Sequence, residues 1–546
     1  MNNNLRLLAI ILLLVFALQF GGCKKWVDVN YDPSQLSDKD ATPDLILPGI
    51  LTGEAQVLSD QGGVAEWMGY WCFPYHDAVD AAVTYDIRKS DAFPHGGAGA
   101  SKDVALFEAN ALRNNQPFYV GIAKFLKAFD FSGMVDLFNN VPYREAFRSD
   151  IRTPAYDSGQ FIYEDLVKQL DTAITLIKGA PKDKAIRIGV SDIMCHGDKD
   201  KWCRVINTLK LRLLIHQANR ADRQDYIGRE IAKIIREGSG FLGSGEDAAV
   251  NPGFTQQKPS YYFSSVSKYD LYPRNFASSA SYGLVPSWTR TSANTTAMNL
   301  LKNNRDPRLT FFYNPAGTPL PPGATEPFTQ PDPSQYRGGR FGLIVDQFQY
   351  PYQGSDYMSQ IGGVSARGVA VSPASTGIVK GYDMDCFIIT SIESLFMQAE
   401  AIQRGWLPGT PETAYLDAVK ESFRWLNVGG NSLQPQLSDD VFNTWYQAET
   451  AGGNVNVSWS AAPDKYKLLM FQKYMALNGI NSFESYCDYR RNGAYPDVPL
   501  SYSPNRIKDK MPVRSPYPFT EYASNAAHVN AQGPIDIFTS KIWWMP

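Results

Sequence analysis

SGQFIYEDLVKQLDTAITLI, residues 158–177, repeats apolar side chains at intervals of three and four residues. This is the period at which side chains share one face of an α-helix. Asp157 precedes the stretch and is the expected N-cap, because a carboxylate accepts hydrogen bonds from the free N–H groups of the first turn. The pattern therefore predicts an amphipathic helix whose buried face carries Ile162, Leu166, Leu170, Ala173 and Ile177.

The same period recurs on both sides of this stretch, with short turns between the segments. Small residues on the later segments allow adjacent helices to approach closely; these are Ala399, Ala401, Ala414 and Ala418. Successive helix pairs of this kind are typical of tetratricopeptide-like arrays. The sequence therefore predicts a mainly α fold with a scaffold of helix pairs, mainly in residues 100–238 and 384–490. The other periodic segments are residues 122–129, 201–220, 226–238, 390–406, 411–428 and 464–479.

Residues 240–380 have a different character, since Gly, Pro, Ser and Tyr dominate and no period is sustained. Long ordered loops of this kind are often functional. Residues 491–546 are again irregular and end in SKIWWMP, an apolar terminus that we expect to dock on the body. With 546 residues the chain exceeds the usual size of a single core, so two subregions or an extended array are expected.

The N-terminus resembles an export signal. The apolar run at residues 5–20, LRLLAIILLLVFALQF, is shorter than the roughly 20 residues that a spanning helix needs. Gly21 and Gly22 precede Cys23, and small residues before a cysteine are what the lipoprotein signal peptidase accepts. We therefore expect residues 1–22 to be a lipoprotein signal peptide and Cys23 to be the lipidated first residue of the mature chain. A signal anchor and a buried structural cysteine are the alternatives.

Composition and charge exclude some partners and favour others. The net charge is −3, and no run of Lys or Arg exceeds a pair, so nucleic-acid binding is not expected. Aromatic residues make up 13% of the chain, with 30 Tyr and 11 Trp, which suits flat apolar surfaces for sugar rings or protein partners. Ordinary core filling is the alternative use of these rings.

Two aromatic clusters are candidate ligand-binding sites. In the stretch EWMGYWCFPYHD, Trp67 and Trp71 are four residues apart and share a helix face, either as a core stripe or as a stacking platform. A second cluster lies in loop sequence, where rings next to Asn, Asp and Arg fit a neutral sugar or peptide. The candidate ligand-binding residues are Trp67, Tyr70, Trp71, Tyr75, Tyr269, Tyr272 and Trp288, with Tyr261 and Tyr262 in the second cluster.

The cysteines and basic pairs leave several interpretations open. Apart from Cys23 the chain has five cysteines and no CxxC pair, which argues against a zinc ribbon. Cys195 and Cys203 flank a short loop and form a disulfide, contribute with His196 to a metal site, or remain free thiols. No metal or other cofactor is expected. Arg490 and Arg491 either clamp an anionic ligand or form a structural ion pair at a helix end.

No motif for an enzyme is present. The sequence contains no GxSxG elbow, HExxH pair, Walker loop or dinucleotide-binding fingerprint. Carboxylates for glycoside hydrolysis have no fixed spacing in sequence, and Glu66, Glu393 and Glu400 lie on helical segments, where solvated or ion-paired roles are the rule. The protein is therefore expected not to be an enzyme.

Ordered blocks along the chain from Cys23 to Pro546 resemble the SusD/RagB family, in its SusD-like branch. The order and spacing of the blocks are specific, although no single block is. They include VDVNYDPS at 27–34, AFDFSGMVDLFNNVPYREAF at 128–147, RDPRL at 305–309, ESLFMQAEAIQRGW at 393–406, QKYMALNGINSFESYCDYRRNG at 472–493 and IWW at 542–544.

The resemblance implies a tetratricopeptide-like scaffold on which the irregular middle carries the ligand surface. It also implies a lipid-anchored, surface-exposed protein of the outer membrane that captures oligosaccharides, or peptides in the RagB case. Such proteins form a lid over a SusC-type TonB-dependent β-barrel transporter and are not enzymes. Cys23 matches the lipidated cysteine of the family. A tetratricopeptide scaffold that binds only protein and a surface glycoside hydrolase are the alternative functions.

Overall fold

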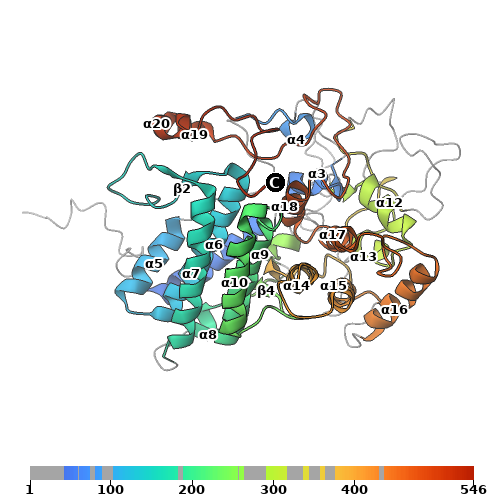
Figure 1. The fold of residues 1–546 in the computed structure, drawn as a ribbon, viewed down its shortest axis with the longest axis horizontal. Coiled ribbons are helices and arrows are strands. Elements are labelled where there is room, and N and C mark those ends of the chain that lie inside the picture. Colours follow the sequence, from blue (N-terminus) through green and yellow to red (C-terminus); the bar gives the residue numbers. More distant parts are fainter. Residues whose placement is uncertain are drawn as a thin grey trace, which may run out of the picture. The chain divides into compact units, whose positions relative to one another are not determined.

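Helices dominate the part of the chain that the structure describes (Figure 1). Residues 43–546 form one unit. This computed structural model describes residues 42–59, 61–73, 80–88, 102–181, 188–255, 257–263, 291–316, 336–343, 357–362, 376–429 and 436–546.

The first half of the scaffold is a set of long helices that pack side by side (Figure 1). Helix α6 contacts α5 on one side and α7 along its length, and α7 in turn contacts α9. Close approach of α6 and α7 requires Gly121, because a Cβ there would lie 2.6 Å from the Ile177 side chain. These helices are α5 (Lys102–Arg113), α6 (Pro117–Phe138), α7 (Gly159–Gly179), α9 (Lys199–His216) and α10 (Gln224–Glu237).

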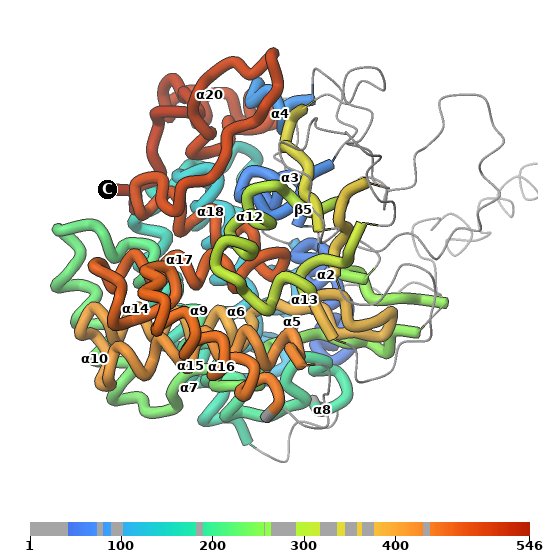
Figure 2. Tube along the Cα trace, turned by 90° about the vertical axis from the view of Figure 1, so that its right-hand side faces the viewer, coloured from blue at the N-terminus to red at the C-terminus, as the bar shows by residue number. Residues whose placement is uncertain are grey.

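The second half of the scaffold is also built from helices that pack side by side. Helix α14 packs on α15, α17 and α9, so it joins the two halves (Figure 2). Ala399, Ala401 and Ala418 are buried at these contacts, as their small size predicts. The helices are α14 (Ser391–Gln403), α15 (Pro411–Leu426), α16 (Gln436–Ala451), α17 (Lys465–Ala476) and α18 (Ser482–Arg491).

Short elements connect the scaffold. The described strands form three two-stranded antiparallel sheets, which are β1 (Trp71–Cys72) with β5 (Ser292–Ala293), β2 (Val141–Pro142) with β3 (Tyr156–Asp157), and β4 (Ala248–Val250) with β6 (Cys386–Ile389). The remaining described α-helices are α2 (Pro43–Leu58), α3 (Gly62–Trp67), α4 (Ala81–Thr84), α8 (Ile188–Ser191), α12 (Thr295–Asn303), α13 (Leu309–Phe312), α19 (Phe519–Ser524) and α20 (Ala526–Asn530).

The helix ends follow the local chemistry, with one correction. Gly238 ends α10 in the left-handed conformation, with φ of 83°, as expected for a C-cap. The N-cap of α7 is Ser158, whose hydroxyl accepts from the Phe161 N–H, and not Asp157. The Asp157 carboxylate is instead buried and pairs with Arg144 at 2.6 Å. Neighbouring polar residues compete for a cap, and the tertiary partner of Asp157 decides which one takes it.

A large hydrophobic core runs through both halves of the scaffold. A second cluster lies where α10 covers α9 and α14, and it is built from Leu211, Leu214, Ile215, Ile227, Ile231, Ile234, Met397 and Ala401. The C-terminus docks on the body as predicted, since Trp544 is fully buried and its Nε1 donates to Asp136 Oδ1 at 2.7 Å. Within the described ranges, every helix is too short or too polar to cross a bilayer.

Candidate functional site

The first aromatic cluster lies in the core. Trp67, Tyr70 and Trp71 are buried. The Tyr70 hydroxyl lies 2.6 Å from the Tyr474 carbonyl, and Trp67 Nε1 donates to the Ala82 carbonyl at 2.9 Å. Trp67 is the last residue of α3 and packs against Tyr85 and Tyr486, whereas Trp71 lies in β1, so the two rings do not share the helix face that their spacing predicted. The three rings are enclosed in the core, the alternative that the sequence also allowed, and they form no open stacking platform.

The second aromatic cluster is only partly visible. Tyr262 is buried and its hydroxyl donates to the Gly479 carbonyl at 2.5 Å, while Tyr261 packs on the core. Tyr262 is therefore closed to stacking, and Tyr261 is half-buried. Four candidate ligand-binding residues and the lipidation site lie outside the described residues; they are Tyr75, Tyr269, Tyr272, Trp288 and Cys23.

Cys195 and Cys203 are buried free thiols, so the disulfide alternative is wrong. The loop between them is organised by Asp192, whose carboxylate accepts from the Cys195 and Gly197 N–H groups at 2.9 Å. The same carboxylate accepts from Trp202 Nε1 at 2.7 Å. His196 is exposed on this loop. The closely spaced residues are therefore held by a buried carboxylate acceptor, a role that cysteine spacing does not reveal.

The carboxylates considered for catalysis are buried in the interior, where each has a partner. Glu66 is fully buried and accepts from the Phe73 N–H at 2.7 Å. Glu393 pairs with Arg212 inside the scaffold. Glu400 accepts two bonds from Arg491, at 2.7 and 2.6 Å. None of these three side chains lines a described cavity.

Arg490 and Arg491 have structural roles. Arg491 is fully buried and bridges Glu400 and Asp488. Arg490 Nη1 donates to the Asp136 carbonyl at 2.6 Å and to the Val513 carbonyl at 3.0 Å. The interpretation of the pair as an ion-pair device at a helix end is correct for Arg491. Arg490 instead ties α18 to α6 and to the C-terminal segment.

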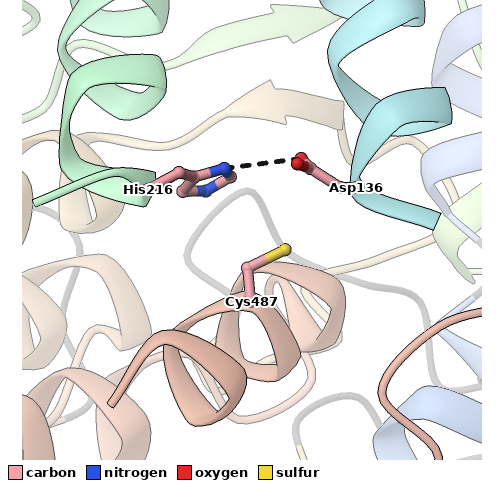
Figure 3. A group of neighbouring side chains, drawn as sticks. All are labelled: Asp136, His216 and Cys487. Carbon is pink, nitrogen blue, oxygen red and sulfur yellow. Dashed lines mark ion pairs between the residues drawn. The ribbon is translucent and has the colours of Figure 1, made fainter. Parts of the chain in front are cut away.

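Asp136, His216 and Cys487 converge from α6, α9 and α18, and their ligand atoms lie within 4.8 Å of one another (Figure 3). His216 Nδ1 lies 3.4 Å from Asp136 and Nε2 lies 3.1 Å from Glu484. Burial alone would lower the pKa of His216, but these two carboxylates raise it to about 9. The ring is therefore a buried imidazolium at neutral pH.

To bind a metal ion, this group would have to lose two protons, one from the His216 imidazolium and one from the Cys487 thiol. Burial raises the pKa of the Cys487 thiol well above its usual value. Arg490 Nη2 also lies 3.1 Å from the sulfur, which disfavours a cation there. The three side chains are types that bind zinc, but their protons and the neighbouring guanidinium form a cluster that already balances its charge. We interpret the group as a structural contact that links α6, α9 and α18.

A groove with a volume of about 860 Å³ opens where α12 and α13 meet the ends of α15 and α16. Its apolar lining is Leu301, Pro307, Leu309, Phe311, Val428 and Val441, and its polar lining includes Lys302, Arg305, Thr310 and Thr376. Apolar floors with a few polar groups at the rim are typical of small-molecule sites, which commonly measure roughly 300–1,000 Å³.

The RDPRL segment builds one wall of this groove from the inside. Arg308 is fully buried and pairs with Asp306 at 2.6 Å, while its Nη1 donates to Ser422 Oγ at 2.7 Å. The Ile378 N–H donates to the Phe311 carbonyl at 3.1 Å and so ties residues 376–378 to α13. The wall is therefore rigid beneath its exposed residues. The groove's only described carboxylate, that of Asp306, is occupied by Arg308.

Arg305 stands at the rim in an uncommon backbone conformation. Its φ is 47°, in the left-handed region that glycine usually occupies after a helix. Its side chain is 71% exposed, and its Nε donates at 2.6 Å to the buried Glu449. This bond orients the guanidinium, which remains largely exposed at the rim. Sequence analysis missed this groove, although the RDPRL block was the one local signal that could have found it.

Lys302 is the second cation of the groove. Its ammonium donates to the Tyr336 carbonyl. Partial burial, together with nearby Arg337, lowers the pKa of Lys302 to about 8. The groove therefore offers hydrogen-bond donors beside an apolar floor, an arrangement suited to binding a hydroxyl-rich ligand.

A sequence model of the SusD-like family, described as starch-binding and associating with the outer membrane, matches residues 100–518. The chain belongs to the SusD-like family. The match includes the helices of the scaffold and the groove residues. None of the curated protein sequences matches this chain.

Solved SusD homologues share the fold over nearly the whole chain. One from Bacteroides fragilis aligns with a TM-score of 0.69 and 17% identity, covering 93% of this chain and 100% of its own. One from Bacteroides uniformis gives 0.68 and 19%, covering 92% and 99%. A chitin-binding SusD homologue from Flavobacterium johnsoniae gives 0.63 and 20%, covering 91% and 97%. At these identities the likeness establishes the fold, and it confirms the predicted helix-pair scaffold.

Proposed function

We propose that this protein is a lipid-anchored surface protein that captures oligosaccharides and delivers them to a SusC-type TonB-dependent transporter of the outer membrane. The family match is the observation that carries the proposal. The chitin-binding relative supports a glycan as the ligand class. The groove supports binding in place of catalysis, because its one described carboxylate is paired with Arg308. Release into the transporter needs no chemistry in this chain, since the transporter supplies the energy of import.

Filling the groove tests where the glycan binds. Replacing the exposed Thr310 by tryptophan places an indole over the floor beside Phe311, so affinity should fall at least about tenfold, or roughly 1.4 kcal/mol. Thr172→Trp, at an exposed position of α7, is the matched control and should bind normally. The measurement is calorimetric titration of residues 24–546, which contain the whole 43–546 unit, with chito-, malto-, xylo- and manno-oligosaccharides and a peptide set.

The panel also separates the alternatives. Saturable binding of a peptide and no glycan would change the ligand class to the RagB type. Silence across the panel, together with firm association with the transporter, would favour a protein-binding scaffold. Formation of a shortened glycan, lost on replacing one carboxylate, would contradict a non-catalytic role. Equal affinity of Thr310→Trp and wild type for the bound glycan would remove the groove from the proposal.

Lipidation at Cys23 is tested separately. Labelled palmitate should enter the full chain expressed in a Gram-negative host, and Cys23→Ala should abolish incorporation, because the Cys23 sulfur is the atom that receives the diacylglyceryl group. Cys203→Ala removes a buried thiol and should leave incorporation unchanged. Incorporation that persists in Cys23→Ala would place the anchor at another residue.

A further inference from the structure

A second, smaller cavity lies on the opposite half of the scaffold from the groove, between α5, α6 and the segment after β2. Its volume is about 200 Å³, and it is lined by Val104, Ala105, Glu108, Lys127, Asp130, Phe131, Tyr143, Ala146 and Phe147. It shares no lining residue with the groove. Its lining includes three aromatic rings and three charged side chains, whereas the lining of an ordinary gap in the core is apolar.

Phe147 forms the outer wall of this cavity. Its side chain is 46% exposed, and its backbone has a φ of 61°. A bulky aromatic residue in the left-handed region is uncommon and costs conformational energy. The ring lies 6.4 Å from Phe131, whose own ring packs edge-on against Tyr143 at 4.8 Å. Phe147 is therefore the exposed ring of the cavity, and Phe131 and Tyr143 support it from the buried side.

Polar groups of both signs face the same space. The Lys127 ammonium lies 4.8 Å from the centre of the Tyr143 ring and makes no ion pair within the described ranges. Glu108 is held at 3.2 Å by Lys124, and Tyr143 donates to Asp165 at 2.6 Å. Lys127 thus retains donors for a ligand, and the Glu108 carboxylate retains acceptor positions.

Asp130 adds a buried acceptor at the inner end. Glu54 of α2 is hydrogen-bonded to Asp130, and burial, followed by the Asp130 charge, raises the pKa of Glu54 to about 9. The two carboxyl groups therefore share a proton in the hydrogen bond between them at neutral pH. This bond occupies one acceptor position of Asp130 and fixes the orientation of its carboxylate.

We propose that this cavity is a second saccharide subsite, which binds a single hexopyranose ring by stacking on Phe147 and by hydrogen bonds to Lys127, Glu108 and Asp130. The inference rests on the proposed glycan-binding function and extends it. The apolar C–H face of a pyranose fits an aromatic surface, and its hydroxyls both donate and accept. The size of the cavity restricts it to one ring, whereas the groove is about four times larger.

The test uses single sugars on residues 24–546. Glucose, galactose, mannose, xylose and N-acetylglucosamine are titrated by saturation-transfer NMR and by calorimetry. Phe147→Ala should weaken the best monosaccharide roughly fivefold to tenfold, since one stacking ring is lost. Phe519→Ala removes an even more exposed ring, on α19, and should change nothing. Lys127→Met, which keeps the apolar stem, should weaken binding by a similar factor.

Further variants distinguish binding in the small cavity from binding in the groove. Phe147→Gly relieves the left-handed strain while removing the ring, so loss of sugar binding in a stably folded protein supports the subsite. Thr310→Trp should retain monosaccharide binding in the small cavity while losing oligosaccharide binding in the groove. Oligosaccharide binding with no monosaccharide binding, or with monosaccharide binding unchanged in Phe147→Ala and Lys127→Met, would overturn the subsite and leave the proposed function standing. Absence of any glycan binding would overturn both.

Discussion

Arg491→Met is expected to lower the free energy of unfolding by about 3–5 kcal/mol, because it removes the buried cation that bridges Glu400 and Asp488 and leaves them to Arg404 and Lys473. Arg491 and Glu400 are fully buried, and the guanidinium contacts Glu400 through two bonds at 2.7 and 2.6 Å. Its Nε donates to Asp488 at 2.7 Å. Methionine fills much of the volume but provides neither charge nor donors.

The pKa of Glu400, the acidic partner of Arg491, makes the expected loss of stability depend on pH. Burial would raise the pKa of Glu400, but Arg491 and then Arg404 outweigh it and lower the pKa to about 2. In Arg491→Met the Glu400 carboxyl can become neutral by taking up a proton, so the loss of stability relative to wild type should shrink as the pH falls. Urea unfolding at pH 7 and at pH 5 measures both effects.

The control for this variant is a surface pair. Arg148 pairs with Asp150 at 2.7 Å, and both side chains are more than half exposed, so Arg148→Met should leave the unfolding midpoint unchanged. Equal midpoints for Arg491→Met and wild type at pH 7 would show that the buried pair does not hold α18 to α14.

His216 should make stability depend on pH between about 6.5 and 9. Its pKa is raised in the folded protein to about 9 from 6.5, because the Glu484 and Asp136 carboxylates outweigh its burial. The folded protein therefore holds a proton that the unfolded chain releases. The contribution is complete below pH 6.5 and is lost as the pH rises through 9. It is on the order of 3 kcal/mol.

The variant His216→Asn isolates this contribution. The difference in unfolding free energy between wild type and variant should be largest near pH 6 and should shrink steadily toward pH 9.5. His196→Asn is the matched control, because His196 is exposed and its φ of 54° is one that asparagine tolerates. A difference that stays constant from pH 6 to pH 9.5 would mean that His216 is neutral in the folded protein.

Much of the scaffold could be predicted from local patterns. The stripe through residues 158–177 became α7, and the segment at 226–238 became α10 with Gly238 at its end. Such patterns are legible because burial of one helix face requires apolar residues at a fixed period. The N-cap of α7 was mispredicted, because Asp157 and Ser158 are chemically equivalent caps until Arg144 engages one of them.

The sites were much less predictable. Trp67 and Trp71 have the spacing of one helix face, but α3 ends at Trp67, Trp71 lies in β1, and both rings are buried, which only the tertiary structure shows. The groove brings together residues from α12, α13, α16 and the segment after α15, whose positions in sequence span Leu301 to Val441. Phe147 carries no local signal at all, since its exposure follows from the turn after β2.

The sequence by itself therefore determined the helical periods, the family and the cysteine expected to carry the lipid, because each of these depends on neighbouring residues or on ordered blocks. Only the tertiary structure decided which aromatic rings are enclosed, which carboxylates are paired and where open space remains. The physical reason is that burial and ion pairing depend on contacts between distant segments. Glu400 and Arg491 lie on α14 and α18, and nothing in the sequence around either residue indicates that they form an ion pair.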